Sequence, residues 1–407
     1  MGFTYADAFF VTEQALYIGQ SEEIDTGFGL YRYGFDEGEW DLIGFDGYAI
    51  FGIVVWGESD ENILLRTWDG SGSGTWRSTD SGVSWVQTGN PLSGLPALQS
   101  PADTSRMISE TSYSTDSGWT WNESNLTWYL YGGRGQAYDP SNGSVAYYTA
   151  GLGDETSRIY RTTNGGAIWS QVWLEGFNQM QGIDVEWDKG AHVMTCNDIQ
   201  SRVLITSDAG QNWTWRPSPF HPREVLSPPW AASCFFVAGS AADETTYEVW
   251  WTSDLGDTWT SYSVGLPILP GPYWNNWIRI QAHPTEPILF VALEPTGVWR
   301  LDLSAVSAID GEELDLAETR LAAYPNPSSG SVTIAFQDNS SLPMRSIRVV
   351  DVMGRVVNTL DASSEGTPLR WDGRDRQGRE VASGVYRIVT LRPDGHVGES
   401  ERVLILR

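Results

Sequence analysis

The stretch Thr252-Ser-Asp-Leu-Gly-Asp-Thr-Trp259 recurs along the first three hundred residues and decides the fold. Its pattern is Ser/Thr-x-Asp/Asn-x-Gly-x-x-Trp, which we call the turn motif. An Asp or Asn side chain accepts hydrogen bonds from the backbone that follows it, and Gly readily adopts a positive φ, so the motif predicts a tight turn between two strands. The five copies contain Asp80, Gly82 and Trp85; Asp116, Gly118 and Trp121; Asn164, Gly166 and Trp169; Asp208, Gly210 and Trp213; and Asp254, Gly256 and Trp259.

The spacing of the turn motif indicates a repeat architecture. Its third positions are separated by 36, 48, 44 and 46 residues. Such a period is typical of propellers, in which each repeat forms one four-stranded antiparallel sheet. Weaker copies at 31–40 and 297–301 extend the series in both directions. We therefore expect an all-β fold in which residues 1–303 form a seven-bladed β-propeller, or a six-bladed one if the first repeat is not a blade.

The turn motif resembles the Asp-box of the bacterial neuraminidase repeat, found in sialidase-like and YCF48-like propellers. The resemblance points first to sialidases, but their Arg-Ile-Pro signature is absent. Xyloglucanases with two tandem propellers of this repeat type use a carboxylate pair in the cleft between them, and this sequence has repeats for one propeller. Asp184 and Glu224 could flank a bond, yet their spacing does not single them out, so we predict no catalytic residue.

The amino-acid composition limits the classes of molecule that this protein could bind. The 407 residues include 25 Lys and Arg and 52 Asp and Glu, for a net charge of −27, and Lys189 is the only lysine. Such a surface repels nucleic acid and anionic lipid and would attract cations or basic partners. No apolar run is long enough to be a transmembrane segment. No signal peptide is present in this chain, and we expect that the natural N-terminus is missing.

The connections from the fourth strand of one repeat to the first strand of the next lie on the face where we expect a ligand. The most distinctive is 270–277, which brings aromatic rings beside side-chain amides, as sugar recognition requires. The alternative is that these rings plug the channel of the propeller. The predicted binding residues are Tyr273, Trp274, Asn275, Asn276, Trp277, Arg134, Gln181, Arg223 and Glu224.

The connections between the second and third strands lie on the same face and carry acidic residues in most repeats. Carboxylate oxygens are ligands that Ca²⁺ prefers, so this rim could hold Ca²⁺ or a cationic partner. A solvated acidic rim without a ligand is the alternative. The candidate metal ligands are Asp154, Glu155, Asp198, Asp243 and Glu244.

The sequence changes character after residue 303. Residues 304–322 form an acidic linker, and 323–407 contain alternating apolar runs with turns at Asp372-Gly and Gln377-Gly, which predict a small seven-stranded β-sandwich. Tyr324-Pro-Asn-Pro, 347–357, 371–379 and Ala382-Ser-Gly-Val-Tyr386 resemble the C-terminal sorting domain of the type IX secretion system, and equally the FlgD-type Ig-like domain. The resemblance implies export by the type IX machinery. A structural appendage is the alternative.

Together these patterns predict a bacterial protein that is extracellular or lies on the outer cell surface. We expect a binding or scaffold protein whose propeller recognises a glycan or a protein partner. One alternative is a glycoside hydrolase acting at the same face, which would need converging ionisable groups with shifted pKa values. A second alternative is a self-assembling surface or filament subunit.

Overall fold

The structure is a computed structural model. It describes residues 8–20, 29–68, 72–89, 96–126, 135–151, 156–176, 180–197, 200–231, 233–241, 246–263, 266, 278–293, 297–303, 321–324, 331–336, 346–351, 356–361, 369–382, 384–391 and 397–405. The chain divides into two compact units, Met1–Ser304 and Ala305–Arg407. Every regular element among the described residues is a β-strand, so the predicted all-β fold is confirmed.

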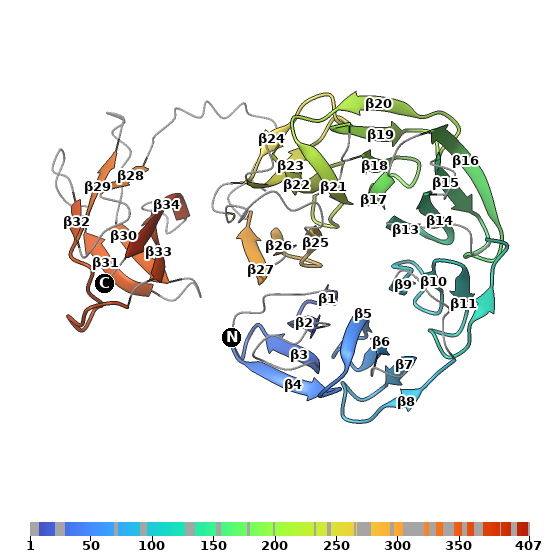
Figure 1. Cartoon of the computed structure of the whole chain (residues 1–407), viewed down its shortest axis with the longest axis horizontal. Helices are drawn as coiled ribbons and strands as arrows, with labels where there is room; N and C mark the ends of the chain where they lie inside the picture. The colour runs from blue at the N-terminus through green and yellow to red at the C-terminus, as the bar shows by residue number, and fades with distance from the viewer. Residues whose placement is uncertain are drawn as a thin grey trace. The chain divides into compact units, whose positions relative to one another are not determined.

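In the first unit, antiparallel sheets follow one another around a ring (Figure 1), and strands within each sheet pair in chain order with the first strand innermost. The first three sheets contain β1 (Ala8–Val11), β2 (Ala15–Gln20), β3 (Gly29–Gly34) and β4 (Trp40–Gly44); β5 (Ala49–Trp56), β6 (Asn62–Trp68), β7 (Ser73–Ser78) and β8 (Val86–Gln87); and β9 (Leu98–Gln99), β10 (Met107–Ser109), β11 (Ser112–Ser114) and β12 (Asn122–Glu123).

The remaining sheets of the ring contain β13 (Gly135–Asp139), β14 (Asn142–Gly151), β15 (Thr156–Thr162) and β16 (Trp169–Gly176); β17 (Met180–Val185), β18 (Val193–Asn197), β19 (Arg202–Thr206) and β20 (Thr214–Pro217); β21 (His221–Leu226), β22 (Phe235–Ser240), β23 (Tyr247–Thr252) and β24 (Thr260–Ser261); and β25 (Ile278–Ala282), β26 (Ile288–Leu293) and β27 (Gly297–Asp302). The last sheet has three strands among the described residues.

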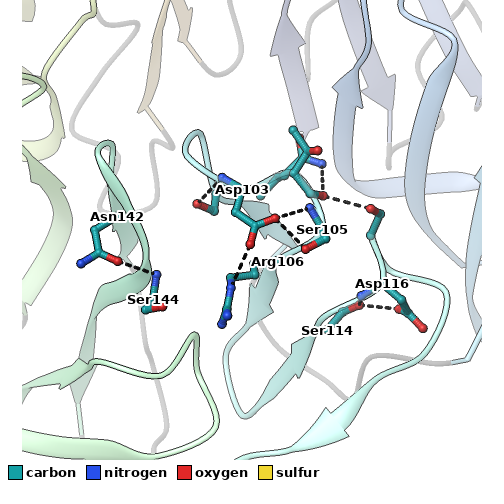
Figure 2. Close-up of polar contacts among 11 residues, drawn as sticks. Asp103, Ser105, Arg106, Ser114, Asp116, Asn142 and Ser144 are labelled. Carbon is teal, nitrogen blue, oxygen red and sulfur yellow. Dashed lines mark hydrogen bonds and ion pairs between the residues drawn. The ribbon is translucent and has the colours of Figure 1, made fainter.

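Each turn motif forms the predicted tight turn between two strands, which are the third and fourth of its sheet, and its polar side chains close the turn. In the second copy, Ser114 Oγ accepts a hydrogen bond from Gly118 N at 2.9 Å and donates one to Asp116 Oδ1 at 2.8 Å. Asp116 also accepts from the backbone N of Thr120 at 2.9 Å and from its hydroxyl at 2.6 Å. Figure 2 shows the contact between Ser114 and Asp116. Trp121 Nε1 donates to Gly118 O at 3.2 Å.

The other four copies repeat this network of hydroxyl, carboxylate or amide, and backbone N–H. The hydroxyl donates to the Asp or Asn oxygen at 2.8 to 2.9 Å in each. Hydrogen bonds favour the ionised carboxylate. The Asn212 backbone and side chain, with Thr206, therefore lower the pKa of Asp208 to about 2. The same kind of bonding lowers the pKa of Asp80.

The fourth position of the motif has a left-handed backbone conformation. The φ angle is 58° at Ser81, 57° at Ser117, 58° at Ala209 and 57° at Leu255, although none of these is glycine. A Cβ is unfavourable in this region of φ/ψ space. The hydrogen bonds of the turn therefore hold a conformation that these residues seldom adopt alone.

The third sheet is the smallest, with strands of two or three residues, which accounts for the short 36-residue step in the sequence. Before β10, Asp103 accepts hydrogen bonds from Ser105 and from Arg106 Nε at 3.0 Å (Figure 2). Two glycines of the next sheet face this pair: a Cβ at Gly143 would lie 2.8 Å from Asp103 Cβ, and one at Gly165 would lie 2.3 Å from Arg106 Nη1. Because glycine has no side chain, these two positions let neighbouring sheets approach closely.

Apolar side chains fill the spaces between consecutive sheets. Met194 and Cys196 of β18, for example, pack with Phe235 and Val237 of β22 in one buried cluster. Cys196 and Cys234 are both buried and free. Cores of this kind, repeated around the ring, tie each sheet mainly to its two neighbours.

The first and last sheets close the ring through side chains. Phe9 and Ile18 share a buried cluster with Phe290 of β26. Gln281 of β25 bridges directly to β1: its Nε2 donates to Phe9 O at 2.9 Å, and its Oε1 accepts from Val11 N at 3.0 Å. One amide side chain thus continues the backbone hydrogen bonding across the junction. The segment 305–309, which could add a fourth strand here, lies outside the described residues.

The second unit is a two-layer β-sandwich, as predicted. Val332, Ile334 and Trp371 of one sheet are buried against Ile347 and Ile388 of the other. The described strands are β28 (Leu321–Tyr324), β29 (Val332–Phe336) and β32 (Leu369–Trp371) in the first sheet, and β31 (Val356–Asp361), β30 (Ser346–Asp351), β33 (Gly384–Leu391) and β34 (Val397–Ile405) in the second.

Both turns predicted in this unit are present. Gly373 and Gly378 have φ angles of 72° and 77°, a backbone conformation that favours glycine. Trp371 stands edge-on to Tyr386 with their ring centroids 5.3 Å apart. The Tyr386 hydroxyl donates to Ala382 O at 2.9 Å.

We predict that Gln281→Ala destabilises the first unit by about 1–3 kcal/mol, because it leaves the Val11 N–H and the Phe9 carbonyl without their partner at the ring junction. Gln99→Ala is the matched control: Gln99 makes one exposed bond, to Thr104 O, and we expect a loss under about 0.5 kcal/mol. Denaturant unfolding measures both. Equal losses would show that the bridge does not hold the ring closed.

We predict opposite effects for two adjacent substitutions in the fourth turn motif. Ala209→Gly relieves the left-handed strain, worth about 1 kcal/mol, and we expect unchanged or higher stability. Gly210 has φ 85°, and a Cβ there would meet no atom closer than 3.5 Å, so Gly210→Ala isolates the backbone cost of about 1–2 kcal/mol. Thermal unfolding compares the two variants. A more stable Gly210→Ala variant would contradict this account of the turn.

Candidate functional site

The described part of the predicted binding surface lies on inner strands. Gln181 is in β17, and Arg223 and Glu224 are in β21. The prediction that they belong to loops was wrong. Both strands contain irregular pairing, between Met180 and Ile183 and between Pro222 and Glu224, and such bulges let a strand continue through sequence that reads as a loop.

Gly182 brings β17 and β21 together. A Cβ at this position would lie 2.8 Å from Glu224 Cα and 2.9 Å from Val225 N, which leaves no room for any side chain. On the other side of β17, Thr149 Oγ1 donates to Gln181 O at 3.1 Å. The backbone of β17 is therefore fixed between its neighbours, with Gln181 buried and Asp184 beside β21.

Glu224 forms an ion pair with the next inner strand. Arg279 Nη1 of β25 donates to Glu224 Oε2 at 2.8 Å, with 29% and 19% of the two side chains exposed. Burial raises the pKa of Glu224, and the charge of Arg279 opposes this rise. The positive charge of Arg279 favours the ionised form of Glu224. The resulting ion pair links β21 to β25. Glu224 was predicted as a binding residue, and its pairing with Arg279 was not predicted from the sequence.

Asp184 accepts two backbone hydrogen bonds. Ser227 N donates to its Oδ2 at 2.7 Å and Val185 N to its Oδ1 at 2.8 Å. Burial nevertheless raises the pKa of Asp184 to about 7, and the nearby charge of Glu224 adds to the rise while both N–H groups oppose it. The structure thus places the Asp184 and Glu224 carboxyl groups on adjacent inner strands, each engaged by a protein donor.

A second polar cluster, which the sequence analysis missed, lies at the third sheet. Glu110 Oε1 accepts from the Tyr148 hydroxyl at 3.2 Å, and the Glu110 backbone N–H donates to Gln136 Oε1 at 3.3 Å. Gln136 Nε2 donates in turn to Pro96 O. Burial raises the pKa of Glu110, and the charge of Arg66 opposes this. The two-residue turn between β10 and β11 places Glu110 there, and no motif in the sequence marks this residue.

The other predicted site residues lie outside the described residues. These are the binding candidates Arg134, Tyr273, Trp274, Asn275, Asn276 and Trp277 and the metal candidates Asp154, Glu155, Asp198, Asp243 and Glu244. Within the part of the chain that the structure describes, no group of three or more His, Cys, Asp or Glu side chains is arranged to hold a metal ion.

The second unit matches a known family. Residues 322–391 match the model of the secretion system C-terminal sorting domain. The predicted type IX sorting domain is confirmed over this range, and it directs export of the protein to the cell surface or the extracellular space. The structure as described contains no helix capable of crossing a membrane.

Two curated relatives are xyloglucanases. Xyloglucanase Xgh74A of Acetivibrio thermocellus is 23% identical over 338 residues, which cover 82% of this chain and 35% of that protein. A xyloglucanase of Hypocrea jecorina is 26% identical over 222 residues, covering 49% of this chain and 23% of that protein. This chain therefore spans about a third or less of the length of these relatives.

Solved structures share the propeller fold. The GH74 enzyme of Niastella koreensis aligns over 100% of this chain and 73% of its own, with a TM-score of 0.57 and 16% identity. YCF48 bound to D1 peptide aligns over 77% of this chain and 94% of its own, with a TM-score of 0.52 and 14% identity. At these identities the likeness shows the fold alone: the first unit is a β-propeller.

We predict that Asp184→Asn changes how stability depends on pH. The pKa of Asp184 is about 7 in the folded protein and near 3.8 in the unfolded chain, so the folded state binds the proton more tightly. The contribution of Asp184 to stability is therefore largest below about pH 4 and is lost as the pH rises towards 7. Between pH 5 and 7 the wild-type protein should lose about 2–3 kcal/mol relative to the variant.

Urea unfolding of both proteins across this pH range measures the difference. Asp188→Asn at an exposed position three residues beyond β17 is the control, and its curve should run parallel to that of the wild type. A parallel curve for Asp184→Asn as well would mean that Asp184 is ionised throughout.

Proposed function

We propose that this exported protein binds a glycan at the inner strands β17, β21 and β25 of its propeller, which we call the inner-strand face. The proposed contacts are the aromatic segment 270–277 together with Gln181, Arg223 and Glu224. The observation that carries the proposal is the ion pair between Arg279 and Glu224. β25 begins at Ile278, directly after the aromatic segment in the sequence, and the pair holds the start of β25 beside β21. Aromatic rings next to amide, guanidinium and carboxylate groups are what a sugar requires: ring faces for stacking and polar atoms for its hydroxyls.

The carboxyl groups support binding better than cleavage. A glycosidase needs one carboxyl to donate a proton to the leaving oxygen and a second to act as base or nucleophile. Here Glu224 is paired with Arg279, and both oxygens of Asp184 accept backbone N–H groups. These contacts hold strands together, and neither carboxyl group is arranged as the acid or the nucleophile of a glycosidase. Binding requires no proton transfer, so the same arrangement suits a binding protein.

Xyloglucan is the first ligand to test, since the curated relatives are xyloglucanases. It is neutral, so it meets no repulsion from a chain of net charge −27. The sorting domain would bring the propeller through the type IX machinery to the place where such a polymer is met. Retention at the surface through this domain would then keep the polymer close to the cell.

Hydrolysis is the second candidate, favoured by one observation. A pKa of about 7 keeps Asp184 partly protonated at neutral pH, as a catalytic acid must be. Release of reducing ends from xyloglucan by the full-length chain, abolished in Asp184→Asn, would establish hydrolysis and displace the binding proposal.

We predict that the Trp274→Ala/Trp277→Ala double variant loses at least tenfold in affinity for xyloglucan, because the stacking surface is removed. Calorimetric titration of the full-length chain measures the affinity, and the melting temperature should stay within a few degrees of the wild-type value. Trp119→Ala, at a 40% exposed position in a turn motif, is the control and should bind normally. Unchanged binding in the double variant, or no binding by the wild-type chain across a glycan array, would overturn the proposal.

A further inference from the structure

A groove lies on the outside of the propeller, between the outer strand β20 and the turn motif of the following sheet. It has a volume of about 540 Å³, within the range of about 300–1,000 Å³ usual for small-molecule sites. Its lining includes Arg216, Pro217, Pro219, Trp250, Asp257 and Trp259. Strand β20 is outermost in its sheet and β17 innermost, so this groove is separate from the inner-strand face discussed above.

Trp259 departs from the pattern of its motif to form one wall of the groove. In three other copies the indole N–H donates within its own turn: Trp85 to Gly82 O, Trp121 to Gly118 O and Trp213 to Gly210 O. Trp259 Nε1 instead donates to Pro217 O of β20, at 3.2 Å. The ring therefore reaches from its own turn to the preceding sheet.

Phe220 fixes the two tryptophans of the groove. It is fully buried and stacks on Trp250, with ring centroids 5.8 Å apart and 7° between the planes. It meets Trp259 edge-on, at 6.0 Å and 85°. The two indole planes are therefore close to perpendicular. Rings held in this way lose little freedom when a ligand binds.

Both indole N–H groups are already used. Trp250 Nε1 donates to Glu248 Oε2 at 3.0 Å, and Trp259 Nε1 to Pro217 O. The tryptophans thus offer carbon surface to the groove and no donor. A proline-rich peptide, which also docks on aromatic surfaces, presents backbone carbonyls that need such donors, so it suits this groove poorly.

Arg216 and Asp257 offer polar atoms beside the rings. Arg216 Nε donates to Asp257 Oδ1 at 2.6 Å, and Arg216 Nη1 faces Trp215 O at 3.5 Å. Arg216 Nη2 and Asp257 Oδ2 have no partner among the residues that the structure describes. The side chains are 32% and 61% exposed, so both atoms are accessible to a ligand.

We propose that this groove is a second carbohydrate site, which binds a neutral oligosaccharide. A sugar ring combines an apolar C–H face with hydroxyls that donate and accept, and the groove combines indole surface with the donors of Arg216 and the acceptor oxygen of Asp257. An anion would meet Asp257 and the negative field of the chain, and a cation would meet Arg216. A β-1,4-linked glucan fits best, because its equatorial hydroxyls leave both faces of each ring flat.

Calorimetric titration of the full-length chain with cellohexaose tests the proposal. We expect Trp259→Ala to weaken binding at the groove at least tenfold. Trp213→Ala is the matched control: it removes the same residue from the same motif position, where the indole bonds only within its own turn, and its affinity should stay within twofold of the wild-type value. The Arg216→Gln/Asp257→Asn double variant keeps both rings and should weaken binding at least threefold, which decides the case if Trp259→Ala fails to fold.

The Trp274→Ala/Trp277→Ala variant distinguishes binding at the inner-strand face from binding at the groove. Cellohexaose binding that survives in this variant and disappears in Trp259→Ala supports the groove, whatever the inner-strand face binds. Loss in the first variant alone overturns the groove and leaves the function proposed above intact. No binding of cellohexaose by the wild-type chain, or binding of decaproline in its place, overturns the groove as a carbohydrate site.

Discussion

The propeller depends on one repeated interaction, the acceptance of hydrogen bonds by an Asp or Asn oxygen in the turn before the outer strand. In each copy this oxygen and the neighbouring hydroxyl satisfy donors that the tight turn would otherwise leave without partners. The bonds also hold the left-handed residue at the fourth position. With the turn fixed, the Trp that follows enters the outer strand at a constant place, and neighbouring sheets pack against it.

The turn motif was predictable because everything it needs lies within eight residues. The all-β fold, the sheet order and the sorting domain followed from such local patterns. The small third sheet was visible too, in the shortened step between two motif copies. Where local chemistry decides the structure, the sequence is sufficient.

The features that prediction missed all join residues far apart in the chain. Glu224 and Arg279 are 55 residues apart, and neither position has a local pattern that marks the pair. The bulges that place Gln181 and Glu224 in strands depend on pairing with β18 and β22. Trp259 has a perfect motif around it and still turns to another sheet, because Pro217 offers it a carbonyl. Sequence indicated which residues matter, and packing between sheets decided what they contact.

The way in which the ring closes has a consequence for how the protein folds. Every sheet of the ring is built from strands that are consecutive in the chain, so most contacts are local in sequence, and such contacts form quickly because little loop entropy is lost. The junction between Phe9 and Gln281 is different, because it joins residues 272 positions apart. Among the strands that the structure describes, none is shared across this junction. The sheets can therefore form and stack in any order, as in other repeat proteins, and the joining of the two ends is the single slow, non-local step that converts an open curved array into a ring.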